Sequence, residues 1–393
     1  MRLVACGVLV VGLAPAVALA SFDGLWNGRF GGVALDVLGT EVSLYQVSES
    51  HRWPLDRFTL DGEGRFQTGD GRRYRLTRDG ERLDILDERD AVFLSFLPTV
   101  GLPPLREPTD DPAIVFDVFW EAFAENHALF DLTGVDWAAV RDSGREAAIA
   151  ADGPDALFEV LSDLLAPLND RHTTLVWPAA GRLYRSGRAS DPFWQGRANT
   201  FLLNIAVNYL GRPLQSRLAD PRLRFGILPG NVGYLYVADF LDGGALPSFA
   251  TTLTLVLEEL RDTDGLVVDL RFNPGGVDRN TRAFMEQLWP PDQQAAYFRE
   301  RRLTGPLPGD FEEAELLRIA PRENAFYRRP IVFLTGADTA SAAETVLLAA
   351  VGLPRVVQIG EASAGVFSNL LLRFYPNGWY STLSNEQFYS LTG

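Results

Sequence analysis

The chain contains no lysine, and all 36 of its basic residues are arginine. Arginine stays protonated in proteins and does not act as a general base, so a serine–lysine catalytic dyad is excluded. The arginines are outnumbered by 51 acidic residues, which gives a net charge of -15 at pH 7. Nucleic-acid binding requires a basic surface, and the acidic balance argues against it.

Cysteine and histidine are nearly absent. The one cysteine, Cys6, lies close to the N-terminus, and the three histidines are His51, His127 and His172. This set is too small and too scattered for a zinc cluster. The sequence also lacks a glycine-rich loop that would cradle phosphate groups. We therefore expect neither a metal nor another cofactor.

Long apolar runs are missing after the first twenty residues. Arg2 precedes the apolar stretch Leu3 to Leu19, and Ala18-Leu19-Ala20 fits a cleavage site with small residues. Residues 1–20 are thus predicted to be a signal peptide. We expect export to the periplasm or the extracellular space, with no stable membrane span. Cleavage near Ala20 would leave a chain without cysteine, which depends on core burial and not on disulfides.

Residues 21–100 show the pattern of an all-β domain. Val33, Leu35 and Val37 alternate with other residues, as expected for strands with one buried face. Asp61-Gly62 and Asp79-Gly80 are strong turn signals between such runs. The proline-rich stretch from Pro98 to Pro108 then has the composition of a linker.

Residues 109–180 are predicted to be a helical segment. Asp110 or Asp111 can cap a helix that has Pro112 at its first position. Aromatic residues follow at helical spacing. A second amphipathic helix is expected from about Pro154 to Pro167.

Residues 225–393 alternate between strand and helix patterns, which indicates an α/β core. Residues 290–329 are rich in charge and proline and are expected to run over the surface. The predicted strands are 232–240, 266–272, 331–334, 356–359, 370–375 and 379–383; the predicted helices are 249–260, 280–289, which Asn280 would cap, and 345–351.

Ser341 lies between the apolar strand pattern of 330–334 and the helix pattern of 345–351. A serine at such a strand–turn–helix junction exposes its hydroxyl at the edge of a sheet, near the positive end of a helix. Many hydrolases place a nucleophile there. A nucleophilic serine needs a base, and without lysine the base must be a histidine or a carboxylate.

Two further segments are candidates for chemistry. His172 follows the second predicted helix in a short polar turn, where functional residues are frequent, although a histidine bonded to local backbone is the alternative. Asn273-Pro274-Gly275-Gly276 ends a buried strand and can leave backbone amides free to stabilise an oxyanion. An ordinary strand-ending turn is the alternative there. His127 continues an aromatic helix face and is predicted to be packed in the core, whereas His51 is predicted to be at the surface.

Four motifs in this order resemble the tail-specific, or C-terminal processing, serine peptidases. They are Asp170-x-His172-Thr173, Asp269-Leu-Arg-x-Asn-Pro-Gly-Gly276, Thr339-Ala-Ser-Ala-x-Glu344 and Gly360-Glu-x-Ser-x-Gly365. The superfamily includes tricorn protease and the interphotoreceptor retinoid-binding protein. The resemblance covers roughly residues 109–393.

The resemblance implies an α/β fold with a core like that of crotonase and Clp protease. It maps the nucleophile onto Ser341, and the oxyanion hole onto the backbone of Gly275, Gly276 and Ala342. One branch of the family uses a lysine where this chain has Val366. The tricorn-like branch uses a histidine, which corresponds to His172 as general base.

The chain departs from the family pattern in three places. Arg171 precedes His172 where relatives often carry glycine, and it would either lower the proton affinity of His172 or bind an acidic substrate group. The stretch from Leu175 to Val232 is too short for the peptide-binding PDZ domain of many relatives. The glutamate that completes the charge relay in tricorn-like members would come shortly after Gly393, so we expect the sequence to be incomplete there; Glu361 and Glu386 are the available substitutes.

The favoured hypothesis is an exported serine peptidase that acts on peptides or proteins. The alternative is a non-catalytic binding protein on the same fold, with an apolar ligand or a peptide as partner. Sequence alone leaves the substrate specificity, the oligomeric state and the role of the β-domain open.

Overall fold

The computed structural model describes most of the chain after the expected signal peptide, which lies outside the described residues. Its described ranges are 22–69, 71–87, 92–187, 196–242, 247–289, 295–303, 309–320 and 327–393. The chain divides into two compact units, Met1–Leu105 and Arg106–Gly393. Within the described ranges, no helix is both long and apolar enough to cross a membrane.

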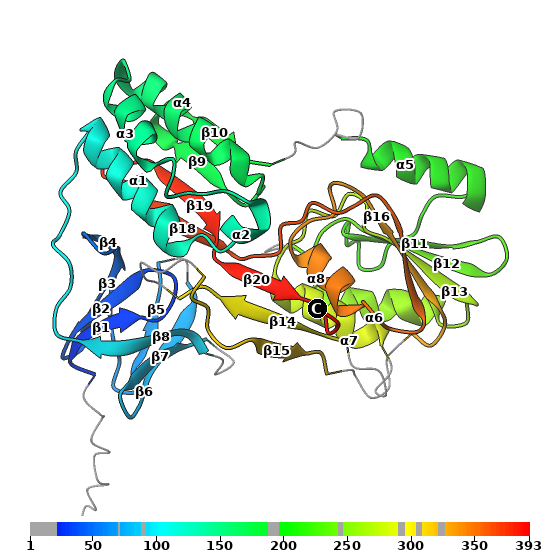
Figure 1. Cartoon of the computed structure of the whole chain (residues 1–393). Coiled ribbons are helices and arrows are strands. Elements are labelled where there is room, and N and C mark those ends of the chain that lie inside the picture. The colour runs from blue at the N-terminus through cyan, green and yellow to red at the C-terminus, as the bar shows by residue number, and fades with distance from the viewer. Residues whose placement is uncertain are drawn as a thin grey trace, which may run out of the picture. The chain divides into compact units, whose positions relative to one another are not determined.

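The first unit is an eight-stranded antiparallel sheet, as the alternating pattern predicts (Figure 1). Its core includes Trp26, Leu35 and Phe96. The strand order is β4-β3-β2-β1-β8-β7-β6-β5. The strands are β1 Gly24–Gly28, β2 Val33–Leu38, β3 Glu41–Val47, β4 Arg52–Thr59, β5 Arg65–Gln67, β6 Arg73–Asp79, β7 Arg82–Leu86 and β8 Val92–Thr99.

The prediction for His51 is wrong. Its side chain is buried in this unit, and its Nδ1 lies 2.7 Å from the Ser48 hydroxyl. The polar neighbours Ser50 and Arg52 suggested a surface position, but the local turn folds the ring inward onto Ser48. His51 therefore has a structural hydrogen bond within the first unit.

The second unit begins with a layer of helices. The helices are α1 Pro112–Asn126, α2 Phe130–Thr133, α3 Arg141–Ile149, α4 Gly153–Leu165 and the short 3-10 helix η1 Ala166–Leu168. Asp111 is the cap of α1, because its Oδ1 accepts a hydrogen bond from the Ala113 amide at 2.9 Å. The aromatic face of α1 is buried, as its spacing predicts.

These helices pack on a four-stranded sheet with the order β10-β9-β19-β18. The strands are β9 Thr174–Trp177, β10 Arg182–Arg185, β18 Leu370–Phe374 and β19 Tyr380–Ser384. The sequence places the last two strands in the α/β core, but β19 pairs with β9. The reason is burial: Tyr375, Trp379 and Leu383 complete the apolar cluster of α1 and α4.

The α/β core is a five-stranded sheet with the order β11-β12-β13-β16-β17, in which only β11 is antiparallel to its neighbour. Helices α6, α7 and α8 pack on one face. Helix α5 packs on the other, where Leu202 contacts Tyr234 and Tyr236 of β12. The elements are α5 Ala198–Ile205, the π-helical η3 Ala206–Leu210, β11 Leu223–Leu228, β12 Val232–Val237, α6 Phe249–Leu260, β13 Gly265–Asp269, α7 Asp278–Leu288, β16 Ile331–Thr335, α8 Ala342–Ala349 and β17 Val356–Gly360.

Two local expectations differ from the structure. Asn280 does not cap α7, which begins at Asp278; its side-chain amide instead donates to the carbonyl of Phe240 at 2.9 Å. Within 290–329, the strands β14 Ala296–Arg301 and β15 Glu315–Arg318 join β20 Glu386–Tyr389 in a three-stranded sheet with the order β15-β14-β20. Ala295, Ile319 and Tyr327 are buried in the core cluster, so this segment is not only a surface excursion.

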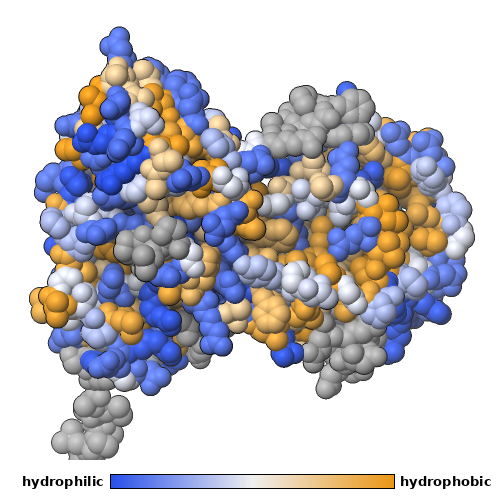
Figure 2. Space-filling view, viewed as in Figure 1, coloured by the Kyte–Doolittle hydropathy of each residue, from blue (hydrophilic) through white to orange (hydrophobic). Residues whose placement is uncertain are grey.

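The expected α/β fold with a separate N-terminal all-β domain is thereby confirmed. Figure 2 shows apolar side chains exposed over the part of the surface where Figure 1 places the five-stranded sheet. Exposed apolar residues of this sheet include Ile227 on β11 and Val357 and Ile359 on the edge strand β17.

Candidate active site

Ser341 lies at the turn between β16 and α8 and is the first residue before the helix. Its backbone has φ 54° and ψ -124°, a left-handed conformation that is unusual for a residue with a side chain. Such a conformation costs roughly 1–3 kcal/mol and persists where the surroundings impose it, often at functional sites. The geometry resembles the strained strand-to-helix turn that presents a nucleophile at a sheet edge. The Ser341 side chain is half-buried, and its backbone carbonyl accepts a hydrogen bond from the Glu344 amide at 2.7 Å.

The buried Glu344 carboxylate fixes this turn. It accepts hydrogen bonds from the amides of Ser341 at 2.9 Å, Gly365 at 2.6 Å and Val366 at 2.9 Å. Burial raises the pKa of Glu344, while these hydrogen bonds and that of Ser363 oppose the rise. Glu344 therefore ties the start of α8 to the loop that carries Val366, whose own side chain is buried where the lysine branch has its base.

The Gly275–Gly276 turn lies directly against Ser341. The Asn273 carbonyl accepts a hydrogen bond from the Ala340 amide at 3.0 Å. A Cβ on Gly275 would stand 2.8 Å from both the Ala342 nitrogen and the Ser341 Cβ. The structure thus brings together the two segments that the sequence assigns to the nucleophile and to the oxyanion hole.

The amides of this turn are not equivalent. Gly275 donates its N–H to the side-chain oxygen of Asn273 at 2.8 Å, so this amide is occupied. The amides of Gly276 and Ala342 donate no hydrogen bond within the described parts of the chain. Of the three predicted oxyanion donors, Gly276 and Ala342 thus have amides without an acceptor among the described residues, whereas the Gly275 amide already has one.

His172 lies between η1 and β9, in the turn that the sequence predicts. Its amide donates to Asp170 Oδ1 at 3.0 Å, and its carbonyl accepts from the Thr382 hydroxyl at 2.5 Å. Burial lowers the pKa of His172 below its usual 6.5, and the nearby cations of Arg185 and Arg171 add to this. The carboxylate of Asp170 and the carbonyl of Ser368 oppose the shift without reversing it. The ring is therefore neutral at pH 7, as a general base must be.

The turn of His172 is attached to the loop that leads to Ser341. Arg171 donates from Nη1 to the carbonyl of Ala337 at 3.1 Å, and the same atom lies 3.6 Å from the Asp338 carboxylate. Within the described residues the ring of His172 and the hydroxyl of Ser341 form no hydrogen bond, and Nδ1 of His172 has no partner. Catalytic hydrogen bonds are often absent in a ligand-free enzyme and form only with substrate.

His127 belongs to the core, as its place on the α1 face predicts. Its side chain is 1% exposed, and its ring packs edge-on against Phe130 with centroids 4.8 Å apart. Of the two histidines in the second unit, His172 is thus the one whose turn contacts the loop that precedes Ser341.

The candidate substitutes for a charge-relay acid do not contact the His172 ring. The Glu386 carboxylate accepts from Arg301 at 3.2 Å and from the Asn369 amide at 2.9 Å. Glu361 lines the pocket described next. Among the described residues no carboxylate accepts a hydrogen bond from the ring, and no group of three or more metal-binding side chains is placed to hold an ion.

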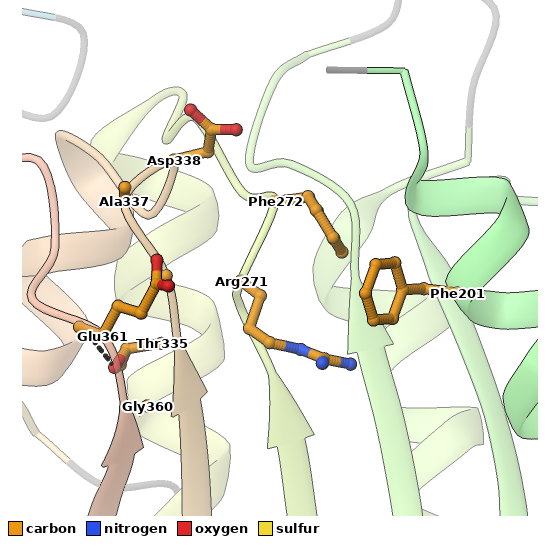
Figure 3. A pocket seen from close by; sticks show the side chains of 9 residues that line it. Phe201, Arg271, Phe272, Thr335, Ala337, Asp338, Gly360 and Glu361 are labelled. Atoms are coloured by element: carbon orange, nitrogen blue, oxygen red, sulfur yellow. Dashed lines mark hydrogen bonds between the residues drawn. The ribbon is translucent and has the colours of Figure 1, made fainter. Parts of the chain in front are cut away.

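A pocket of about 230 Å³ opens at the carboxyl ends of β13, β16 and β17 (Figure 3). Phe201 of α5 and Phe272 lie on one side, together with Arg271. The ends of β16 and β17 form the other side, with Ala337, Asp338 and Glu361. The carboxyl ends of parallel strands are where α/β proteins most often bind ligands.

Residues 231–393 match the sequence profile of peptidase family S41. This part of the chain is a peptidase family S41 domain. The match confirms the resemblance to the tail-specific serine peptidases that the motifs indicate, and it supports a serine-type peptidase.

Solved structures with the same fold agree with this assignment. A peptidase structure from Parabacteroides merdae aligns with a TM-score of 0.60 at 22% identity, and the alignment covers 72% of this chain and 86% of that chain. The structure of mature CPAF aligns with a TM-score of 0.51 at 12% identity, with 72% and 90% covered. At these identities the similarity shows the fold of this S41 peptidase and nothing finer.

Several residues shape the site through contacts that the sequence does not predict. Thr339 bridges the two catalytic segments, because its hydroxyl accepts from the Gly336 amide at 3.0 Å and donates to the Leu270 carbonyl at 2.8 Å. Asn273 occupies the Gly275 amide. Phe201 contributes to the pocket from a helix that is distant in sequence. Each of these contacts depends on the tertiary fold, and only the positions of Asn273 and Thr339 inside motifs could have drawn attention to them.

Proposed function

We propose that this S41 peptidase is exported and cleaves peptide bonds through an acyl-enzyme on Ser341, with His172 as general base. The observation that carries the proposal is the strained Ser341 turn, packed against Gly275–Gly276, with the turn of His172 attached to the same loop. The signal peptide predicted for residues 1–20 supports export.

The proposed reaction has two steps. His172 takes the hydroxyl proton as Ser341 Oγ bonds to the substrate carbonyl carbon, and the amides of Gly276 and Ala342 donate to the resulting oxyanion. Protonated His172 then gives the proton to the leaving amine, and the peptide bond breaks. Water attacks the acyl-enzyme by the same route, so that Ser341 regains its proton and the acid product leaves.

A fluorophosphonate probe tests the nucleophile directly, because it forms a covalent bond only with an activated serine. The wild-type protein should be labelled at Ser341. Ser341→Ala should abolish labelling, and His172→Gln should slow it by about 100-fold or more, the range expected for loss of a general base. In a host with a secretion pathway, the mass of the labelled protein should correspond to a chain that begins at Ser21.

Two controls sharpen this test. His51→Gln removes a histidine of the first unit, to which the proposed reaction gives no role, and should leave the labelling rate unchanged. An unlabelled wild-type protein that is purified with a bound apolar ligand would contradict the proposal and favour a binding protein on the same fold. A labelled protein that retains residues 1–20 would contradict the export alone.

A further inference from the structure

The pocket at the carboxyl ends of β13, β16 and β17 has two unlike walls (Figure 3). One wall is aromatic: the rings of Phe201 and Phe272 have centroids 5.3 Å apart, and the Arg271 guanidinium lies 4.9 Å from the Phe201 centroid. The other wall carries the carboxylates of Asp338 and Glu361. A side chain in the pocket thus has aromatic faces on one side and carboxylates on the other.

The charges of the pocket do not cancel. Arg271 is paired with Asp269, through Nε to Oδ1 at 2.9 Å and Nη2 to Oδ2 at 2.6 Å. Asp338 lies 3.6 Å from Arg171. Glu361 is exposed and forms no ion pair with any described residue. The pocket therefore holds one negative charge that the protein does not compensate.

Residues that line the pocket come directly before both turns of the site, the Ser341 turn and the turn of Gly275 and Gly276. Gly336, Ala337 and Asp338 line it and immediately precede the Ser341 turn. Phe272 lines it and immediately precedes the turn of Gly275 and Gly276, which faces Ser341. A peptide whose carbonyl lies between these turns would thus have the pocket beside the residue that supplies this carbonyl.

We infer that the pocket binds the side chain of the residue on the acyl side of the scissile bond and selects arginine or lysine there. This inference rests on the proposed peptidase function. A long basic side chain suits both walls, because its aliphatic stem packs on the rings while its cation lies near Glu361. An acidic side chain would be repelled by Glu361, and an apolar one would leave this carboxylate partly desolvated without a partner.

The test uses coumarin amide peptides that differ only in the acyl residue, with arginine, leucine or glutamate, and the full-length protein. The arginine peptide should have the highest kcat/KM. Glu361→Gln should lower kcat/KM for the arginine peptide by about three- to tenfold, the effect expected for a partly exposed ion pair, and should not lower kcat/KM for the leucine peptide, because the substitution removes the unpaired carboxylate. Glu258→Gln is the matched control, because Glu258 is exposed on α6 outside the pocket and its loss changes the net charge equally.

Fluorophosphonate labelling of each variant separates the two possible failures. Labelled protein that prefers the leucine peptide, or whose arginine-to-leucine ratio is the same in Glu361→Gln as in wild type, would overturn the assignment of the pocket and leave the nucleophile intact. Wild-type protein that is neither labelled nor active on any of the peptides would overturn the proposed function, and the pocket assignment with it.

Discussion

At the scale of single residues, the contacts of Arg171 decide between the two roles that the sequence allows it. The sequence left two roles open for it: lowering the proton affinity of His172 or binding an acidic substrate group. The structure favours the first, because Arg171 already contacts the Ala337 carbonyl and lies near Asp338, and its charge lowers the pKa of His172. It thus holds the loop before Ser341 and helps to keep the proposed base neutral.

The pH dependence of catalysis should report this environment. Because burial and the neighbouring arginines lower the pKa of His172, the acid limb of kcat/KM should have its midpoint below pH 6.5. Arg171→Gln removes one of these cations and should move the midpoint to higher pH. The pH profile of peptide cleavage measures both.

A structural effect of the same substitution can be distinguished from this one. If Arg171 only anchors the loop, Arg171→Gln should lower the rate at all pH values without moving the midpoint. Arg182→Gln provides a matched control, since Arg182 lies on β10 and pairs with Asp155 at 2.6 Å. A midpoint that shifts equally in both variants would contradict the role given to Arg171.

The sequence predicts which residues are candidates for the nucleophile and the base, but it does not predict the hydrogen-bond partners of the residues around them. Ser341 and His172 follow from motifs and from the absence of lysine. The occupation of the Gly275 amide by the Asn273 side chain does not, because either Gly275 or Gly276 satisfies the same pattern. The burial of His51 was missed because its polar neighbours in sequence suggest a surface position, whereas the local turn places its ring against the Ser48 hydroxyl.

At the scale of elements, the site is the meeting point of the turns that follow β13 and β16. The Ala340 amide donates to the Asn273 carbonyl, and Thr339 donates to the Leu270 carbonyl. These contacts require the two backbones to approach closely, which the glycines permit. Gly275 has φ 97°, and a Cβ there would stand 2.7 Å from the Ala340 carbonyl oxygen.

Gly275→Ala should therefore damage both the fold and the chemistry. A backbone clash combined with a left-handed conformation should cost about 2–4 kcal/mol of stability, and any displacement would move Ser341. Urea unfolding and fluorophosphonate labelling measure the two effects. Gly265→Ala at the start of β13 is the control, since its nearest neighbour would be the Pro330 oxygen at 3.6 Å. If both variants lose the same stability and the same labelling rate, the close contact at Gly275 is not what the fold and the site require.

The bounds of elements with strong local patterns could be predicted from the sequence, whereas the elements that they pair with could not. The helix at 249–260 matches α6, because one apolar face and a polar opposite face define it locally. The strands near 370 and 380 were also predicted, but their assignment to the α/β core was wrong. The pairing of β19 with β9 joins segments some two hundred residues apart, and no local pattern encodes it.

At the scale of the whole molecule, the second unit is held together by long-range contacts to the end of α1. Arg302, which follows β14, is buried and donates to the carbonyls of Ala124 and His127 at 2.6 Å each. These carbonyls are among those that the end of a helix leaves without partners. The helical layer is thereby fastened to the three-stranded sheet, at the place where the His127 ring is enclosed.

This enclosure predicts how the stability of the second unit depends on pH. Burial lowers the pKa of His127 to about 4, with Asp170 and Arg302 as the neighbouring charges. As the pH falls below 6.5, His127 becomes protonated in the unfolded chain but stays neutral in the folded chain. The free energy of unfolding therefore decreases, by about 2 kcal/mol at pH 5. His127→Phe should remove this part of the loss, because Phe cannot titrate and fits between Phe123 and Phe130. Urea unfolding followed by tryptophan fluorescence at pH 7 and pH 5 measures it, since Trp137 lies in the same cluster. If wild type and variant lose the same free energy between these pH values, His127 is not the group responsible.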